Sequence, residues 1–218
     1  AIGEVCGRLL RPVTLELGGK SAAIILDDAD LDATIKGLRT ASFVNNGQTC
    51  HLSSRILAPR SRYGEVLDAL AGMVGELKVG DPLDTSTDIG PLVSARQRDR
   101  VLGYIESGKN SSAKLIVGGS VPADQPPRGW FVSPTVFADV DNSDRIAQEE
   151  VFGPVLAVIP YDTDDEAIAL ANDSEFGLAG TVWSSDDERA IEVARAVRTG
   201  TIGINDYQLD FRARSAGG

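Results

Sequence analysis

The sequence predicts an α/β fold in which a mainly parallel, twisted sheet is flanked by helices. The first observation behind this prediction is that short apolar runs alternate along the chain with segments of helical periodicity. The second is that most of these runs are continuously apolar, as in strands that are buried on both faces. Alternating β and α elements favour a parallel sheet, because helices then form the crossovers between strands.

Seven apolar runs are predicted to be strands. They cover residues 13–17, 22–26, 54–57, 114–117, 155–160, 179–183 and 201–204. The stretch from about residue 111 to 128 is rich in Ser, Gly and Pro around one of these strands. We expect this stretch to be a surface excursion, because such residues mark turns and loops.

Helices are predicted between the strands and at the start of the chain, over residues 1–10. Leu31, Ile35 and Leu38 fall on one helical face, which predicts an amphipathic helix there. A second apolar face is formed by Val66, Leu67, Leu70, Met73, Val74 and Leu77.

Two later helices carry capping signals. Thr163 with Glu166, and Ser185 with Glu188, have the spacing of a capping box, in which a hydroxyl and a carboxylate each bind a free backbone N–H of the first turn. Gly200 is expected to end the second of these helices, just past two basic residues.

Composition narrows the class of protein. A chain of 218 residues can form one domain, or one domain and a piece of another. The net charge of −11 argues against nucleic acid or an anionic membrane as a partner. No apolar run approaches the roughly 20 residues that span a bilayer, and no signal segment opens the chain. We therefore expect a cytoplasmic protein, with Cys6 and Cys50 as reduced thiols.

Cys50 is the candidate nucleophile. It ends the run Asn-Asn-Gly-Gln-Thr-Cys, residues 45–50, whose small residues allow close backbone approach and N–H donors for a developing oxyanion. A free cysteine taken alone is more often a buried structural residue. Asn45 and Asn46 are expected to hold the loop through side-chain to backbone hydrogen bonds.

The base for such a thiol is expected to be a carboxylate. His51 is the only histidine, and because it is adjacent to Cys50 its side chain points away in most backbone conformations; we expect it to be exposed and without a role. Glu16 ends the apolar run 13–17, where desolvation would raise its pKa toward neutrality. The alternative is a solvated glutamate at a strand end.

Other cofactor chemistries find no support in the sequence. One histidine and two distant cysteines cannot assemble a zinc site, so no metal is expected. No Walker-type phosphate loop occurs, and no Gly-x-Gly-x-x-Gly follows a predicted strand.

Motifs over nearly the whole chain, in the same order, resemble those of the aldehyde dehydrogenase superfamily. The most specific are Glu-Leu-Gly-Gly-Lys at 16–20 and the run at 45–50 that ends in Cys50. Further blocks that resemble the family lie at 78–82, 88–92, 134–136, 149–155, 172–174, 176–178 and 200–205.

This resemblance implies NAD(P)-dependent oxidation of an aldehyde to a carboxylic acid through a thiohemiacetal and a thioester. It identifies Cys50 as the thiol and Glu16 as the base that activates the hydrolytic water. It also implies that Glu150 binds the nicotinamide ribose and that Phe152 packs near the nicotinamide, although Glu149 is one residue away. The side-chain oxyanion donor of the family is an asparagine of the cofactor domain, and the Cys50 N–H would be the second donor.

The same resemblance predicts the domain organisation. Residues 1–17 are expected to be a remnant of the dinucleotide-binding domain, 18–206 the catalytic thiol domain and 207–218 an atypical tail of a truncated chain. A homo-oligomer is expected for the full-length protein. Two alternatives stay open: a folded but catalytically silent fragment, and a thiol-dependent esterase that needs no nucleotide.

Overall fold

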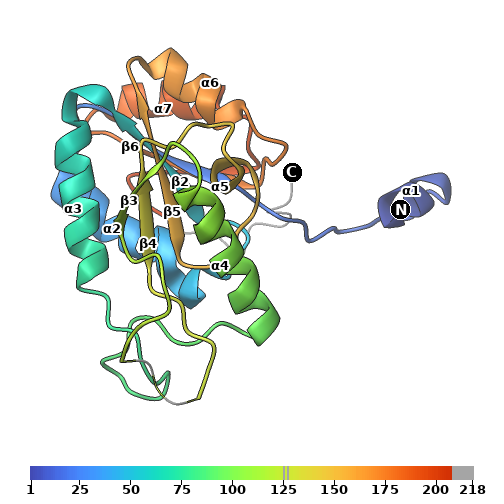
Figure 1. Ribbon diagram of the computed structural model, residues 1–218. Coiled ribbons are helices and arrows are strands. Elements are labelled where there is room, and N and C mark those ends of the chain that lie inside the picture. Colours follow the sequence, from blue (N-terminus) through green and yellow to red (C-terminus); the bar gives the residue numbers. More distant parts are fainter. Residues whose placement is uncertain (125, 127, 208–218) are drawn as a thin grey trace.

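The computed structural model describes residues 1–124, 126 and 128–207, which form one seven-stranded sheet with helices on both faces (Figure 1). The strand order is β3-β4-β5-β2-β1-β6-β7, and every neighbouring pair is parallel except β3 with β4. This confirms the predicted α/β fold. The strands are β1 (Ser21–Ile25), β2 (Ser53–Pro59), β3 (Lys114–Val117), β4 (Thr135–Ala138), β5 (Val155–Tyr161), β6 (Ala179–Trp183) and β7 (Thr201–Ile204).

Each face of the sheet has its own helices and its own core. One face is covered by α2 (Leu31–Phe43) and α3 (Tyr63–Gly75), joined to the sheet by the 3₁₀ turns η1 (Val44–Gly47) and η2 (Arg60–Arg62). The other face is covered by α4 (Ala95–Lys109), α5 (Arg145–Gln148), α6 (Asp164–Asn172) and α7 (Asp187–Ala196). Because both faces are covered, all five residues of β1, an interior strand, are buried, which explains why four of the five are apolar.

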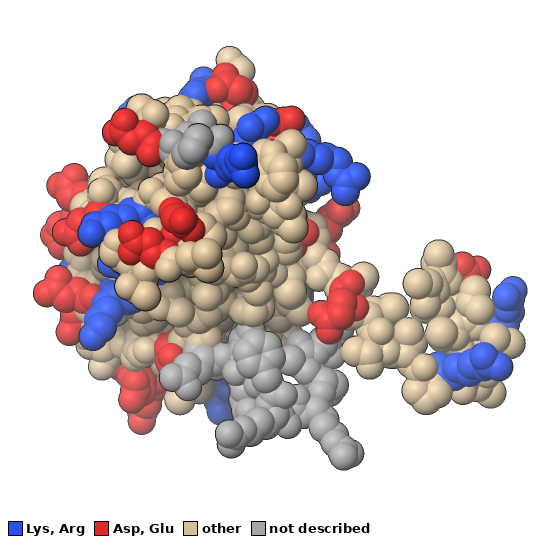
Figure 2. Space-filling model, turned by 90° about the horizontal axis from the view of Figure 1, so that it is seen from below, with Lys and Arg blue, Asp and Glu red and all other residues tan. Residues whose placement is uncertain are grey.

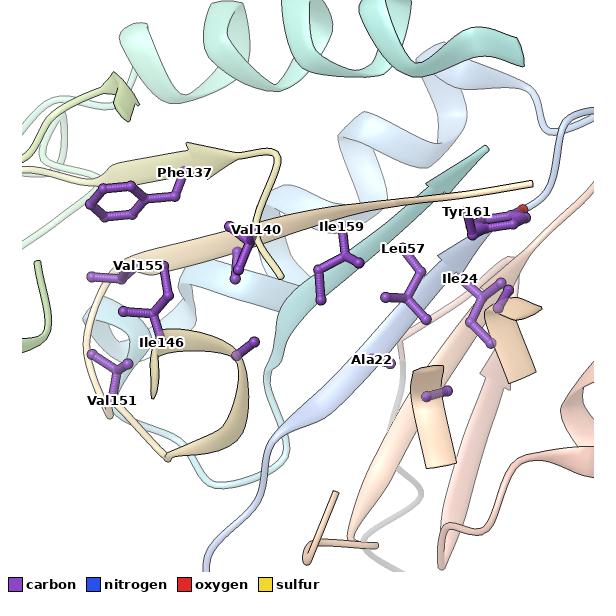
Figure 3. Close-up of a cluster of buried hydrophobic side chains, with 14 of the residues drawn as sticks. Ala22, Ile24, Leu57, Phe137, Val140, Ile146, Val151, Val155, Ile159 and Tyr161 are labelled. Carbon is purple, nitrogen blue, oxygen red and sulfur yellow. The ribbon is translucent and has the colours of Figure 1, made fainter. Parts of the chain in front are cut away.

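The larger core lies between the sheet and α4 to α7 (Figure 3). Ile24 from β1, Leu57 from β2 and Ile159 from β5 point into it side by side, and Phe137 of β4 extends it. Ile146 of α5 closes it on the helical side. This core fixes α5, and therefore the segment that follows α5, against the sheet.

The predicted strand over residues 13–17 is wrong. Helix α1 (Ile2–Arg8), within the predicted helix 1–10, buries none of its residues and stands apart from the sheet (Figure 1). Residues 9–17 after it are exposed and take no regular structure. Alternation of apolar and polar residues does not suffice for a strand, because a ladder needs a neighbouring backbone to pair with.

The other predicted strands agree with the structure to within two residues at each end. Strand β4 was not predicted, because its four residues follow Pro134 without a longer apolar run. Helix α4 was not predicted either. Only Val101, Tyr104, Ile105 and Gly108 of its fifteen residues are buried, so the apolar signal is sparse. Between β3 and β4, residues 118–134 that are described form no helix or strand, as expected for a surface excursion.

The cap of α6 is confirmed with one change. Thr163 Oγ1 accepts the Glu166 N–H at 3.2 Å. The Glu166 carboxylate accepts the Asp162 N–H at 2.6 Å, rather than the N–H of the capping residue itself. Both groups still satisfy backbone donors at the helix start.

The predicted ends of α7 are wrong. Asp186, not Ser185, is the N-cap, and its Oδ1 accepts the N–H groups of residues 188 and 189. The helix ends at Ala196, before Gly200. It stops early because the Arg198 N–H donates to Asn172 Oδ1 at 2.6 Å instead of continuing the helical bonds.

Charged side chains of both signs are mixed around the edge of the face in Figure 2, without a continuous basic area there. No helix in the described part of the chain combines the length and apolarity that crossing a bilayer takes. Residues 208–218, most of the predicted tail, lie outside the described residues.

Candidate active site

The candidate site lies at the amino ends of three neighbouring strands. In the sheet β1 and β5 flank β2, and all three are parallel. Gly19 comes just before β1, Cys50 just before β2 and Gly153 just before β5. Three segments that are far apart in the sequence therefore meet at one edge.

The loop that carries Cys50 has an unusual backbone. Asn45, Asn46 and Gly47 are consecutive left-handed residues, with φ of 52°, 59° and 76°. Asn45 Nδ2 donates to the Gln48 carbonyl at 3.0 Å, and Asn46 binds the backbone of residues 90 and 91. This confirms that both asparagines hold the loop. Asparagine tolerates the left-handed region better than most residues, so the residue types fit the conformation.

Glycines let the three segments touch. A Cβ on Gly19 would lie 2.1 Å from the Cys50 carbonyl oxygen, and a Cβ on Gly47 would lie 2.3 Å from the Gly153 carbonyl. The obstacles are backbone atoms, which cannot rotate away. The thiol loop is thus packed directly against the backbone on both sides, and only glycine fits.

Gly47→Ala is expected to lower the free energy of unfolding by about 3 kcal/mol, because a left-handed φ and a backbone clash add together. Urea unfolding of purified protein measures this. Gly72→Ala is the matched control, because Gly72 is in helix α3 with nothing within 4 Å of its Cβ position, and there alanine is expected to stabilise slightly. Equal stability of the two variants would contradict the packing argument.

Glu150, and not Glu149, lines a cavity together with Cys50. Glu150 Oε1 accepts the Gly19 N–H at 2.9 Å, and the residue lines a cavity of about 20 Å³ with Cys50 and Phe152. Glu149 turns away, bound to Arg145 at 3.0 Å and to the Tyr104 hydroxyl at 2.7 Å. These two partners lower the pKa of Glu149. The geometry therefore separates two neighbours that the sequence left interchangeable.

Glu16 lies outside this packed arrangement. Its side chain is exposed, in the extended segment that follows α1. The apolar strand that was expected to desolvate it does not form among the described residues. Glu16 therefore lies two residues before the glycine pair 18–19 on an exposed segment, without the buried surroundings that were expected.

His51 is not exposed, contrary to the prediction. It is half-buried, and its ring lies 5.5 Å from the ring of Tyr207. Burial lowers the pKa of His51. Burial also raises the pKa of Tyr207, and the negative charge of a Cys50 thiolate adds to this rise. An aromatic pair thus lies on one side of the thiol.

Both cysteines are free, and Cys50 is half-buried. Within the described residues, no group of three or more His, Cys, Asp or Glu is arranged to hold a metal ion. The site is therefore a partly covered thiol between backbone segments, with one carboxylate beside it.

Comparison with known proteins shows the family. The model of the aldehyde dehydrogenase family matches residues 1–218. The chain belongs to this family. It is 58% identical over 216 residues to geranial dehydrogenase of Castellaniella defragrans, covering 99% of this chain and 45% of that protein. It is 45% identical over 200 residues to betaine aldehyde dehydrogenase of Rhizobium etli, covering 92% of this chain and 41% of that protein.

Solved structures agree. The Mycobacterium tuberculosis aldehyde dehydrogenase complexed with NAD⁺ superposes with a TM-score of 0.92 and 53% identity, covering 96% of this chain and 43% of that one. A mutant of aldehyde dehydrogenase C from Pseudomonas syringae, in complex with NAD⁺ and octanal, superposes with a TM-score of 0.90 and 40% identity. The match covers 96% of this chain and 43% of that one. This chain therefore spans less than half the length of the relatives it matches.

Two residues that contact the candidate site were not identified from the sequence. Gln97 Nε2 donates to the carbonyls of Val151 and Phe152 at 3.2 and 2.8 Å, and Arg100 donates to the Glu150 carbonyl at 2.8 Å. Ser94 and Gln97 do have capping-box spacing, and Ser94 Oγ accepts the Gln97 N–H. That signal finds the helix start, but not the use of the Gln97 side chain.

Proposed function

We propose that this chain is the catalytic part of an enzyme that oxidises an aldehyde to a carboxylic acid with NAD or NADP. Residues 18–206 would form the catalytic thiol domain and residues 1–17 the end of a dinucleotide-binding domain. The observation that carries the proposal is the convergence of Cys50, Gly19 and Glu150 at one sheet edge in a member of the aldehyde dehydrogenase family.

The proposed chemistry begins with the thiolate of Cys50, which forms a bond to the aldehyde carbon. The oxyanion that develops would accept a hydrogen bond from the Cys50 N–H. NAD(P)⁺, when bound, supplies the acceptor for the hydride that leaves this carbon. A thioester then remains on Cys50. Glu16 takes a proton from water, the water oxygen bonds to the acyl carbon, the carbon–sulfur bond breaks, and the acid leaves with the thiolate restored.

Glu150 and Phe152 would hold the nicotinamide end of the cofactor. Glu150 fits a ribose hydroxyl, because Gly19 binds only Oε1 and no donor among the described residues binds Oε2. The cavity of about 20 Å³ is far smaller than a dinucleotide, so this chain supplies one wall of the cofactor site. Support comes from relatives whose structures are NAD⁺ complexes.

The position of Glu16 on an exposed segment leads to a prediction. Glu16→Gln in the enzyme that contains this chain is expected to slow hydrolysis of the thioester by at least about 100-fold, because a general base contributes about 10²–10⁴-fold. Mass spectrometry of the enzyme mixed with aldehyde and NAD⁺ should then show an acyl group retained on the peptide of Cys50. Glu4→Gln, on α1, is the matched control. Undiminished turnover by Glu16→Gln would exclude this base.

A catalytically silent fragment is the second candidate for the 218-residue chain by itself. It is favoured by the small cavity and by helix α1, none of whose residues is buried. Aldehyde-dependent formation of NAD(P)H decides between the two, measured for this chain and for the longer enzyme with short- to long-chain aldehydes. If only the longer enzyme turns over aldehyde, both the proposed oxidation and the silence of the 218-residue chain are supported. If neither protein turns over aldehyde, the main proposal is contradicted. Hydrolysis of an ester without nucleotide would instead favour the thiol esterase.

The proposed substrate is a small-molecule aldehyde. Relatives named for geranial and for betaine aldehyde support the class, and they differ too much in chemistry to select one compound. We also propose a cytoplasmic enzyme that forms a homo-oligomer as the full-length protein and binds neither nucleic acid nor membrane. Elution volume in size-exclusion chromatography tests the oligomer.

A further inference from the structure

The segment from Gly90 to Arg100, which we call the bracket, contacts both the loop that carries Cys50 and the segment that carries Glu150. It runs from a loop into the first turns of α4. Towards the thiol, the Gly90 N–H donates to Asn46 Oδ1 at 2.7 Å, and Asn46 Nδ2 donates to the Pro91 carbonyl at 3.2 Å. The Val93 N–H donates to Gln48 Oε1 at 3.0 Å. Three hydrogen bonds thus attach the Cys50 loop to the bracket.

The other end of the bracket holds the segment that carries Glu150. Gln97 binds the carbonyls of Val151 and Phe152, and Arg100 binds the carbonyl of Glu150. Phe152 has a φ of 59°, which is costly for an aromatic residue. Backbone in such conformations persists only where the surroundings determine it, and here the Gln97 amide does so from one side.

The bracket is itself fixed to the body of the protein. Leu92 is 2% exposed, and its N–H donates to the Trp130 carbonyl at 2.9 Å. Val101, directly after the bracket, is fully buried and contacts Gly153 closely enough to exclude any Cβ there. The bracket is therefore anchored to the body of the protein at Leu92 and, just past its other end, at Val101.

We propose that Asn46 and Gln97 are positioning residues that act through the bracket to set the place of Cys50 relative to Glu150. Neither side chain is the nucleophile or the base. Asn46 acts by holding the left-handed turn 45–47 against residues 90 and 91, and Gln97 acts by holding residues 151 and 152. This inference rests on the proposed function, because its consequence is an effect on turnover.

Asn46→Gly tests the thiol side. Glycine accepts a left-handed φ, so this change removes both side-chain bonds without adding backbone strain. Turnover of the enzyme that contains this chain is expected to fall about 10- to 100-fold in kcat, as for a small misplacement of a reacting group, with KM for the nucleotide nearly unchanged. Asn46→Asp keeps an acceptor for the Gly90 N–H and should recover part of the loss. Gln97→Met should instead raise KM for the nucleotide.

Alkylation of Cys50 by iodoacetamide gives a readout that needs no cofactor, in a Cys6→Ser background. Because Cys50 is half-buried, a freed loop should react about threefold faster or more, while turnover falls. Thr163→Ala, which removes the cap of α6 far from the site, is the control for a general loss of stability and should change neither rate.

The outcomes separate the two proposals. Failure of the wild-type enzyme to oxidise any aldehyde counts against the proposed function, and the alkylation rates still decide the positioning role. The positioning role would be overturned if the Asn46→Gly variant were alkylated and turned over substrate at the same rates as the wild-type enzyme. The double variant Asn46→Gly with Gln97→Met should lose less kcat/KM than the product of the two single losses, because both residues act through one bracket. A loss in kcat/KM equal to that product would show that the two residues act independently and would contradict their joint action through the bracket.

Discussion

Replacing Cys50 with serine is expected to lower kcat for aldehyde oxidation by at least about 10⁴-fold, the scale on which loss of a nucleophile acts. The variant is made in the enzyme that contains this chain, and NAD(P)H formation is followed at saturating aldehyde and nucleotide. Stability should change little, because a serine is close to a cysteine in size and Cys50 is only half-buried.

The size of this effect follows from the surroundings of the thiol. A serine hydroxyl becomes a nucleophile only with an adjacent base. His51, the only imidazole in the chain, is adjacent in sequence but its ring pairs with Tyr207. Glu150, the carboxylate that lines the cavity with Cys50, is bound at Oε1 by the Gly19 N–H, and no hydrogen bond joins it to Cys50 among the described residues. Neither neighbour is therefore placed as the base that serine would require.

Cys6→Ser is the matched control, because it removes the other thiol of the chain from a helix that buries nothing. It should retain wild-type turnover. If Cys50→Ser retained more than about 1% of the wild-type kcat, another group would have to be the nucleophile. Removal of even one of the less important residues of a catalytic set lowers kcat by more than this.

The fold could be predicted well where burial alone determines the structure. Strands β1, β2, β5 and β6 are almost entirely buried because helices cover both faces, and their positions followed from the apolar runs that they contain. Residues 13–17 show the opposite case. Their alternating pattern is that of a strand, but pairing depends on a second segment, which a local pattern cannot supply.

The site could be predicted only in part. Cys50 and Glu150 stand in motifs, so the resemblance to the family assigned them, and the structure then brought them to one cavity. The bracket could not be foreseen, because Asn46 and Gln97 bind backbone groups 44 to 55 residues away. Side-chain bonds to a distant backbone leave no periodicity or spacing.

Lys20 is expected to reduce the stability of the protein at neutral pH. It comes directly before β1, is 2% exposed, and its ammonium nitrogen has no hydrogen-bond partner among the described residues. Burial lowers the pKa of Lys20 from 10.5 to about 7, and the nearby Arg55 guanidinium adds to this, while the carboxylates of Glu150 and Glu149 partly offset it. A buried, unpaired ammonium is costly, so the folded protein holds the amine neutral above about pH 7.

The sign of the pH dependence follows from proton binding. Between pH 10.5 and about 7 the unfolded chain binds a proton at Lys20 that the folded protein does not. The contribution of Lys20 to the free energy of unfolding therefore falls by about 1.4 kcal/mol for each unit by which the pH is lowered. It becomes constant below about pH 7, where the folded and unfolded states both bind the proton.

Lys20→Met is thus expected to raise the free energy of unfolding at pH 7 by several kcal/mol, on the order of 4, because methionine has a similar shape and no charge to desolvate. The gain should shrink as the pH rises from 7 to 10, which urea unfolding at pH 7, 8, 9 and 10 would show. Lys36→Met, at an exposed position on α2, is the matched control and should leave the pH dependence of the wild type unaltered. If Lys20→Met instead followed the wild type in parallel across this range, Lys20 would have to be charged in the folded protein, and a counter-ion or water would have to occupy the space beside its ammonium group.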